Sequence, residues 1–295
     1  MIRDDVPKRA RKASGSTTPG SGPAAVPGRN GGGKGYRRVA AFGGVYSNHL
    51  ALAAAVEDAR RREVDAIVCL GDLGAFGPNP DRVFPILEES GAFVIRGNYD
   101  DSIARGLDDC QCGYTDPMDN HYARISYQYT FHNTSPENRA WMAGLPYEKR
   151  FRLGDLDVLA CHGSPRQMNE FLWESTTPDH FLEKQAREQA CDVIVGTHTG
   201  LHWARRFGSR GWYVNAGALG RPANDGSPQV YYAVLEAEDR ELAVEFVPVA
   251  YDHHELAREM REEELPEEFV ETILTGWWTT CLEVLPGKER ARGRW

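Results

Sequence analysis

The chain has 295 residues, of which 41% are hydrophobic and 26% are charged, and its formal net charge is −9. That length is enough to bury the core of one large domain. No apolar run approaches the roughly 20 residues of a membrane helix, and no signal-peptide core follows the basic N-terminus, so we expect no membrane partner and a cytoplasmic location.

The charge is unevenly distributed along the chain. Residues 1–38 carry +7 and the remainder carries −16. Because nucleic-acid backbones need a positive protein surface, the acidic body argues against a nucleic-acid partner. Residues 1–36 are rich in Ser, Thr, Pro, Gly and Ala with no apolar periodicity, which predicts a disordered basic tail.

The six cysteines do not suggest a disulfide framework. Cys69, Cys161 and Cys191 lie within apolar, strand-like runs, as reduced core residues do. Cys110 and Cys112 are too few for a zinc site without further cysteines nearby, so we expect them to be loop thiols.

The body begins with alternating strand and helix patterns. Residues 38–48 read as a strand running into a glycine turn, and residues 50–60 have helical apolar spacing. Residues 64–72 and 93–98 are short apolar runs of the buried-strand type, with a short helix between them. The order predicts a βαβαβ unit.

Metal-capable side chains follow the predicted strands. Asp72 and Asn98 each come directly after a glycine at a strand end. The carboxyl ends of parallel strands face one crevice, so these side chains should meet there. Two later strands, residues 157–161 and 191–195, lead into His162 and His198. A carboxylate, an amide oxygen and two imidazoles form a plausible metal site.

The remaining chain is less regular before it returns to clear patterns. Residues 100–146 have no sustained period, although Ser135 followed by Pro136 predicts a helix start. Strands are expected at residues 212–215, 230–235 and 242–247. Two acidic amphipathic helices broken at Pro266 should occupy residues 253–274.

With these four strand ends in this order, the body resembles the calcineurin-like metallophosphoesterases, and most of all their compact bacterial branch. The resemblance covers about residues 39–249 and rests on GDLGAFGPNP (71–80), RGNYD (96–100), HGSP (162–165) and NAGALGRPANDG (215–226). It implies an α/β fold, a four-layer α/β/β/α sandwich of two mixed sheets, at residues 37–250. Residues 251–295 would form a C-terminal helical extension packed on that domain.

The resemblance also implies a metal site that has lost one half. The ligands for one divalent ion, Mn, Fe, Zn or Ni, would be Asp72, Asn98, His162 and His198. The positions that hold the neighbouring ion in the family are occupied by Gly44, Tyr46 and Gly200. Since all three departures serve the same ion, we expect a single metal.

Several further residues have two interpretations. Tyr99 replaces the usual acid histidine, so Tyr99 and Tyr46 are candidate catalytic groups, with simple cavity filling as the alternative. Candidate substrate-binding arginines, with solvated ion pairs as the alternative, are Arg96, Arg166 and Arg221. We do not expect His49, at a helix start, or His202, in a loop, to rescue the missing metal.

Together these features predict a metal-dependent hydrolase of the phosphoesterase type. Its substrate would be a small phosphorylated metabolite or nucleotide. Two alternatives stay open: an inactive descendant that binds a ligand or partner, and a mononuclear non-haem iron enzyme of another reaction class. The terminal helices and tryptophans could also serve a homo-oligomer contact.

Overall fold

The computed structural model describes residues 35–291. The predicted disordered tail therefore lies outside the described residues, except for its last two positions. There the N–H of Tyr36 donates to the carbonyl of Arg152 at 2.9 Å, so this residue, which was assigned to the tail, is bonded to the body of the chain. The described residues belong to one compact unit that includes the C-terminal helices.

The first sheet contains the predicted βαβαβ unit. Its order is β10-β9-β1-β2-β3, with β1, β2 and β3 parallel and β9 and β10 antiparallel. The strands are β1 (Arg38–Phe42), β2 (Ala66–Cys69), β3 (Phe93–Val94), β9 (Val230–Glu238) and β10 (Glu241–Val249). The connections hold α1 (His49–Arg61), the short 3-10 helix η1 (Pro80–Arg82) and α2 (Val83–Ser90).

The second sheet has the order β4-β5-β6-β8-β7, in which β5, β6 and β8 are parallel. Its strands are β4 (Glu148–Leu153), β5 (Leu156–Cys161), β6 (Val193–Gly196), β7 (His202–Phe207) and β8 (Gly211–Ala216), and α6 (Asp179–Glu188) precedes β6. The two edge strands, β4 and β7, were not predicted. Charged side chains on edge strands reduce pairing with other chains and also hide the apolar pattern.

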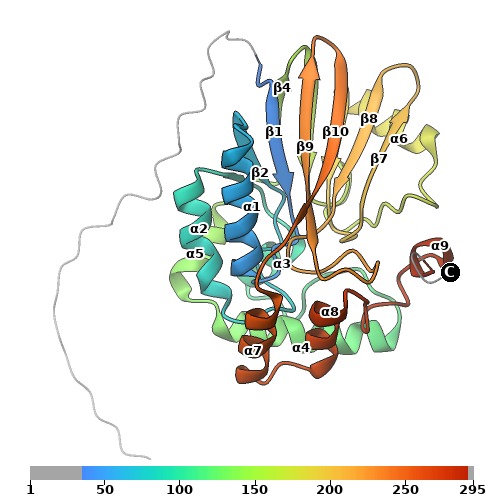
Figure 1. The fold of residues 1–295 in the computed structure, drawn as a ribbon. Coiled ribbons are helices and arrows are strands. Elements are labelled where there is room, and N and C mark those ends of the chain that lie inside the picture. The colour runs from blue at the N-terminus through green and yellow to red at the C-terminus, as the bar shows by residue number, and fades with distance from the viewer. Residues whose placement is uncertain (1–34, 292–295) are drawn as a thin grey trace, which may run out of the picture. The chain divides into compact units, whose positions relative to one another are not determined.

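The layers follow from where the apolar side chains go. Between the sheets, Val39 and Val68 of the first pack against Val158, Val193 and Val214 of the second. A separate core joins the first sheet to α1 and α2, and another joins the second sheet to α6. Figure 1 shows these helices on the outer sides of the two sheets. The predicted α/β/β/α sandwich is confirmed.

Residues 98–143 form helices that the sequence only partly indicated: α3 (Asn98–Arg105), α4 (Pro117–Asn133) and α5 (Pro136–Ala143). Ser135 caps α5 as predicted, because its side chain accepts from the N–H of Asn138 at 3.3 Å. Apolar and polar side chains alternate irregularly along α4, so the sequence lacks the single apolar stripe from which this helix could have been predicted.

The C-terminal helices are α7 (His253–Glu262), α8 (Glu267–Thr275) and α9 (Gly287–Arg290), and the break at Pro266 is confirmed. Leu256 and Phe269 share an apolar cluster with Phe76 and with Tyr122 of α4. Among the described residues, no helix has the length and apolar character needed to cross a membrane.

Asp119 ties this C-terminal segment to α4. Its side chain is buried, and its carboxylate accepts from the N–H groups of Glu283 at 3.3 Å and Val284 at 2.9 Å. We expect Asp119→Ala to lower the free energy of unfolding by about 2–4 kcal/mol, because two hydrogen bonds to a charged group are lost. Urea unfolding checks this, with the exposed Asp108→Ala as the control. Equal midpoints for the two variants would contradict the prediction.

Candidate metal centre

Two consecutive residues with positive φ, Gly71 and Asp72, turn the chain at the end of β2 and direct the side chain of Asp72 into the crevice. Gly71 has φ +87°, and a Cβ there would lie 2.3 Å from the backbone nitrogen of Gly97. Only glycine fits both the conformation and the close approach. Asp72 itself has φ +55°, and its Oδ1 accepts from the N–H of Tyr99 at 3.0 Å.

Asn98 begins α3 directly after Gly97, and its side chain is buried. Nδ2 donates to the carbonyl of Cys110 at 2.9 Å. Oδ1 is buried and has no hydrogen-bond partner among the described residues. Buried polar atoms are normally paired, so this oxygen has the character of a ligand for an ion.

The two histidines complete the group. Nδ1 of His162 lies 2.6 Å from the carbonyl oxygen of Leu70 and therefore carries a hydrogen. Nε2 of His162 lies 3.2 Å from Oδ2 of Asp72 and 3.2 Å from Nδ1 of His198. When two nitrogens each lie about 2.1 Å from one ion and the nitrogen–ion–nitrogen angle is about 100°, the nitrogens are separated by about this distance.

The ligand atoms of Asp72, His162 and His198 all lie within 4.8 Å of one another, and all three residues are buried. The buried Oδ1 of Asn98, which has no hydrogen-bond partner among the described residues, is available as a fourth donor. Two imidazole nitrogens with two oxygens suit borderline divalent ions such as Zn, Mn, Fe or Ni. The residues present therefore fit the ion that the resemblance implies.

The charge states of these side chains also suit metal binding. Burial, and then the neighbouring His162, lower the pKa of His198 to about 3, so this imidazole is neutral. Burial opposes ionisation of Asp72, but His162 more than offsets it and lowers the pKa of that carboxyl. Burial likewise opposes protonation of His162, and Asp72 raises its pKa above the usual value. An ion would take the place of the His162 proton.

Asp100 supports this arrangement from behind, a role not assigned from the sequence although Asp100 closes the RGNYD segment. Oδ2 accepts from the N–H groups of Asp72 and Gly97, both at 2.8 Å, and Oδ1 accepts from Leu73 at 3.0 Å. One carboxylate thus fixes both ligand-bearing turns.

Burial, and then the charge of Asp72, raise the pKa of Asp100 from 3.8 to about 7 in the metal-free protein. The folded protein then binds more protons than the unfolded chain between about pH 4 and 7, so stability from this group is lost as the pH rises through that window. We expect Asp100→Asn to weaken this pH dependence. Urea unfolding of chelator-treated protein at several pH values checks it, and identical slopes for both proteins would contradict it.

Aromatic rings occupy the positions that lack ligands for a second ion. A Cβ on Gly44 would lie 2.8 Å from Cζ of Tyr46, and a Cβ on Gly200 would lie 3.3 Å from the indole of Trp278. Within residues 35–291, Asp72, His162 and His198 are the only grouping of three His, Cys, Asp or Glu donors found. No other such donors rebuild a second site in this part of the chain.

The two candidate catalytic tyrosines are held in packing contacts. The hydroxyl of Tyr99 donates to Oγ of Ser126 in α4 at 2.9 Å, and burial raises its pKa well above the usual value. Tyr99 reaches the ligands only through its backbone N–H. The ring of Tyr46 is buried and packs edge-on against Phe76. These contacts favour the cavity-filling interpretation.

Two of the three candidate arginines are engaged elsewhere. Arg96 is buried, pairs with Asp101 at 2.9 Å and donates to the carbonyl of Ala143 at 2.5 Å. Arg166 pairs with Glu170 on the surface. Arg166 follows the alternative of a solvated ion pair, whereas the pair of Arg96 with Asp101 is buried. Both guanidinium groups are directed to protein acceptors.

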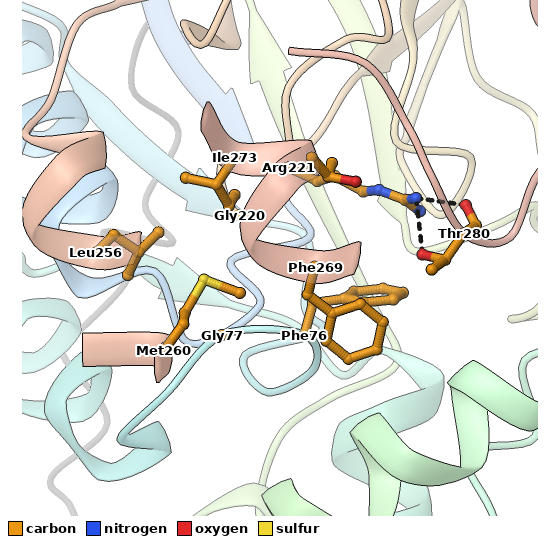
Figure 2. Close-up of a pocket in the computed structure, with 10 residues that line it drawn as sticks. Phe76, Gly77, Gly220, Arg221, Leu256, Met260, Phe269, Ile273 and Thr280 are labelled. Atoms are coloured by element: carbon orange, nitrogen blue, oxygen red, sulfur yellow. Dashed lines mark hydrogen bonds between the residues drawn. The ribbon is translucent and has the colours of Figure 1, made fainter. Parts of the chain in front are cut away.

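Arg221 is the arginine that borders the metal ligands. It lies 3.8 Å from the ring of Trp278. It also donates to the carbonyl of Thr280 at 2.6 Å, as Figure 2 shows. With His198 and Gly200 it lines a cavity of about 10 Å³. That is room for about one water molecule.

The two histidines that were not expected to bind a second metal ion lie in different elements. His49 begins α1, and its Nε2 lies 3.7 Å from Glu259, so it is outside the donor group as expected. His202 begins β7 and stacks on Tyr231, which corrects its assignment to a loop. The strand pairs with β8, and this edge pairing was not visible in the local pattern.

The expected loop thiols Cys110 and Cys112 are joined as a disulfide, with their Cα atoms 5.2 Å apart. This corrects the prediction of loop thiols, because two cysteines separated by one residue are close enough to form a bridge within one short loop. Cys69, Cys161 and Cys191 are free, as predicted.

Comparison with known proteins gives the same superfamily as the resemblance found in the sequence. A family model described as the calcineurin-like phosphoesterase superfamily domain matches residues 38–240. An uncharacterised protein of Methanocaldococcus jannaschii is 24% identical over 251 residues, which cover 81% of this chain and 98% of that protein.

Two solved structures share the fold along nearly their whole length. A metallophosphoesterase from Sphaerobacter thermophilus is similar at TM-score 0.64 and 25% identity, covering 82% of this chain and 99% of its own. A hypothetical protein from Pyrococcus horikoshii is similar at TM-score 0.69 and 22% identity, with coverage of 82% and 99%.

Proposed function

Because the chain belongs to the calcineurin-like phosphoesterase superfamily, we propose that it hydrolyses a phosphate ester with one divalent metal ion. The ion would be held by Asp72, Asn98, His162 and His198. The observation that carries this proposal is the convergence of the Asp72, His162 and His198 donors within 4.8 Å. Asn98, whose buried Oδ1 has no partner among the described residues, directly follows Gly97, where a Cβ would lie 2.3 Å from Oδ1 of Asp72.

A divalent ion at this position would polarise a phosphoryl oxygen and lower the pKa of a bound water. The protein's own groups prepare the site for that chemistry. The ionised Asp72 and neutral His198 are ready to ligate, and the Leu70 carbonyl fixes the ring of His162. Buried aromatic rings around the crevice exclude bulk water, which strengthens electrostatic interactions inside it.

The proposed substrate class is supported by the positive charge beside His198. Arg221, unlike Arg96 and Arg166, lines the cavity beside His198, and planar guanidinium groups suit phosphate oxygens. The cavity of about 10 Å³ leaves little room without movement of Trp278. We propose a small phosphorylated metabolite or nucleotide as the substrate, whose binding would require Trp278 to move.

A second candidate is ligand binding without turnover, and the same crowding favours it. Tyr46 and Trp278 fill the region of the missing ligands, and Tyr99 does not offer its hydroxyl as an acid. With a single ion, less positive charge is available to stabilise a phosphoryl transition state.

Turnover by the full-length protein separates the two candidates. Protein loaded with Mn, Zn, Fe or Ni is assayed on a panel of phosphate monoesters and diesters, alongside a family member of known activity. We expect phosphate or alcohol release that stops after chelation and returns when the metal is restored. Metal-loaded protein that binds phosphate or a nucleotide but releases no product would favour the second candidate.

A further inference from the structure

The disulfide between Cys110 and Cys112 lies beside the metal centre, in the loop between α3 and α4. Both cysteines are largely buried, with 4% and 8% of their surfaces exposed, whereas Gln111 between them is exposed. The other four cysteines are free. The proposed hydrolysis does not use this bridge, although the bridge contacts one of the proposed metal ligands.

The bridge contacts one of the proposed ligands directly. Nδ2 of Asn98 lies 2.9 Å from the carbonyl oxygen of Cys110 and 3.5 Å from Sγ of Cys112. An amide nitrogen only donates, and an amide oxygen can bind a cation. By holding the nitrogen, the loop leaves Oδ1, the buried atom without a partner, for the ion. Groups that orient ligands in this way tune metal affinity.

The same loop also approaches a second ligand. A Cβ on Gly113, next to Cys112, would lie 3.4 Å from the carbonyl oxygen of Asn169 and 3.6 Å from Cε2 of Phe171, whose ring lies 4.3 Å from that of His198. Asn169 in turn donates from Nδ2 to the carbonyl of Gln111 at 2.8 Å. The position of the loop is therefore coupled to two of the four proposed ligands.

A small thiol has space to reach the bridge. A cavity of about 220 Å³ adjoins it, lined in part by both cysteines and by Gln111, Asn120, Arg124 and Asn169. The polar lining would suit a small hydrophilic thiol, and the charge of Arg124 is balanced by Asp109 in the same lining.

We infer that Cys110 and Cys112 form a thiol–disulfide exchange site whose oxidation state sets the affinity for the metal ion. This inference rests on the proposed metal site. A thiolate of the reductant attacks one cysteine sulfur, the S–S bond breaks, and the other cysteine leaves as a thiolate that takes a proton. A second reductant thiol attacks the mixed disulfide and releases the first cysteine and the oxidised reductant, so two electrons pass to the pair.

Reduction removes the covalent closure of the loop, so the contacts that orient Asn98 are no longer fixed. Disturbing groups that orient metal ligands typically costs about 10–100-fold in affinity. The oxidised protein should therefore bind the ion about 10-fold more tightly than the reduced protein, or better.

The test uses the full-length protein, purified in air and then either left oxidised or treated with glutathione and desalted without oxygen. Alkylation under denaturing conditions should add four groups to the oxidised protein and six to the reduced one. Zinc affinity is measured by competition with a chromophoric chelator. Cys112→Ser should bind zinc like the reduced protein and ignore glutathione, whereas Cys191→Ser, outside the loop, should respond like wild type.

The outcomes separate this inference from the proposed function. Three results would each overturn the exchange site while leaving the metal centre intact. These are equal zinc affinity in both oxidation states, alkylation of six cysteines without reductant, and a thiolate charge-transfer band in the reduced Co(II) protein. Failure to bind zinc in either state would overturn the metal centre and this inference with it. Thermal unfolding of Cys112→Ser shows that the variant is folded.

Discussion

Replacement of His162 by Ala should lower zinc affinity at least about 100-fold, a larger loss than changes to groups that merely orient ligands. Nε2 of His162 is the atom that lies 3.2 Å from both Asp72 and His198, so its removal breaks the centre of the donor group. Phosphoesterase activity should fall about 10²–10³-fold, since about 3–4 kcal/mol of transition-state stabilisation would be lost with the ion.

Zinc competition and turnover on the preferred ester measure the two effects. Because His162 is fully buried, His162→Gln is made as well, which keeps much of the side-chain volume. The control is His180→Ala, an exposed histidine of α6, which should leave both quantities unchanged. Wild-type zinc affinity in both His162 variants would contradict the proposed ligand set.

Gly97→Ala should disrupt the metal centre although it replaces none of the four proposed ligands. The φ of Gly97 is −94°, which any residue adopts, so backbone strain plays no part. An added Cβ would lie 2.3 Å from Oδ1 of Asp72 and 2.9 Å from Cε1 of His162. Overpacking of a fixed site typically costs about 1–3 kcal/mol, and displaced ligands should weaken zinc binding about 10-fold or more.

The matched control for this substitution is Gly287→Ala at the start of α9. A Cβ there meets nothing within 4 Å, and its φ is not in the left-handed region. Urea unfolding of the metal-free proteins and zinc competition measure the two effects. If Gly97→Ala matched Gly287→Ala in both, the close packing around Asp72 would not be important for the site.

The parts of the site that could be predicted are those that depend on local patterns. Asp72, Asn98, His162 and His198 each follow a short, buried strand, and the order of parallel strands brings their ends to one edge. The local pattern was sufficient to predict the convergence of Asp72, His162 and His198 because these strands are mostly apolar and buried. The sandwich follows from the same runs, since both sheets are covered on each side.

The parts that could not be predicted depend on distant contacts. Trp278 reaches the space beside Gly200 from the far end of the chain, and Tyr99 directs its hydroxyl to α4, a helix without a clear apolar stripe. Nothing local distinguishes Arg221, at the crevice, from Arg96, which pairs with Asp101. These roles depend on which side chains the folded chain brings together.

The metal content of the purified full-length protein, measured by elemental analysis against protein concentration, decides whether four donors surround a lone cation. We predict one equivalent of a divalent transition metal per chain after loading and removal of excess. Two tightly held equivalents would mean that other groups replace the ligands missing at Gly44, Tyr46 and Gly200. No retained metal would mean that Asp72, Asn98, His162 and His198 do not form a metal site.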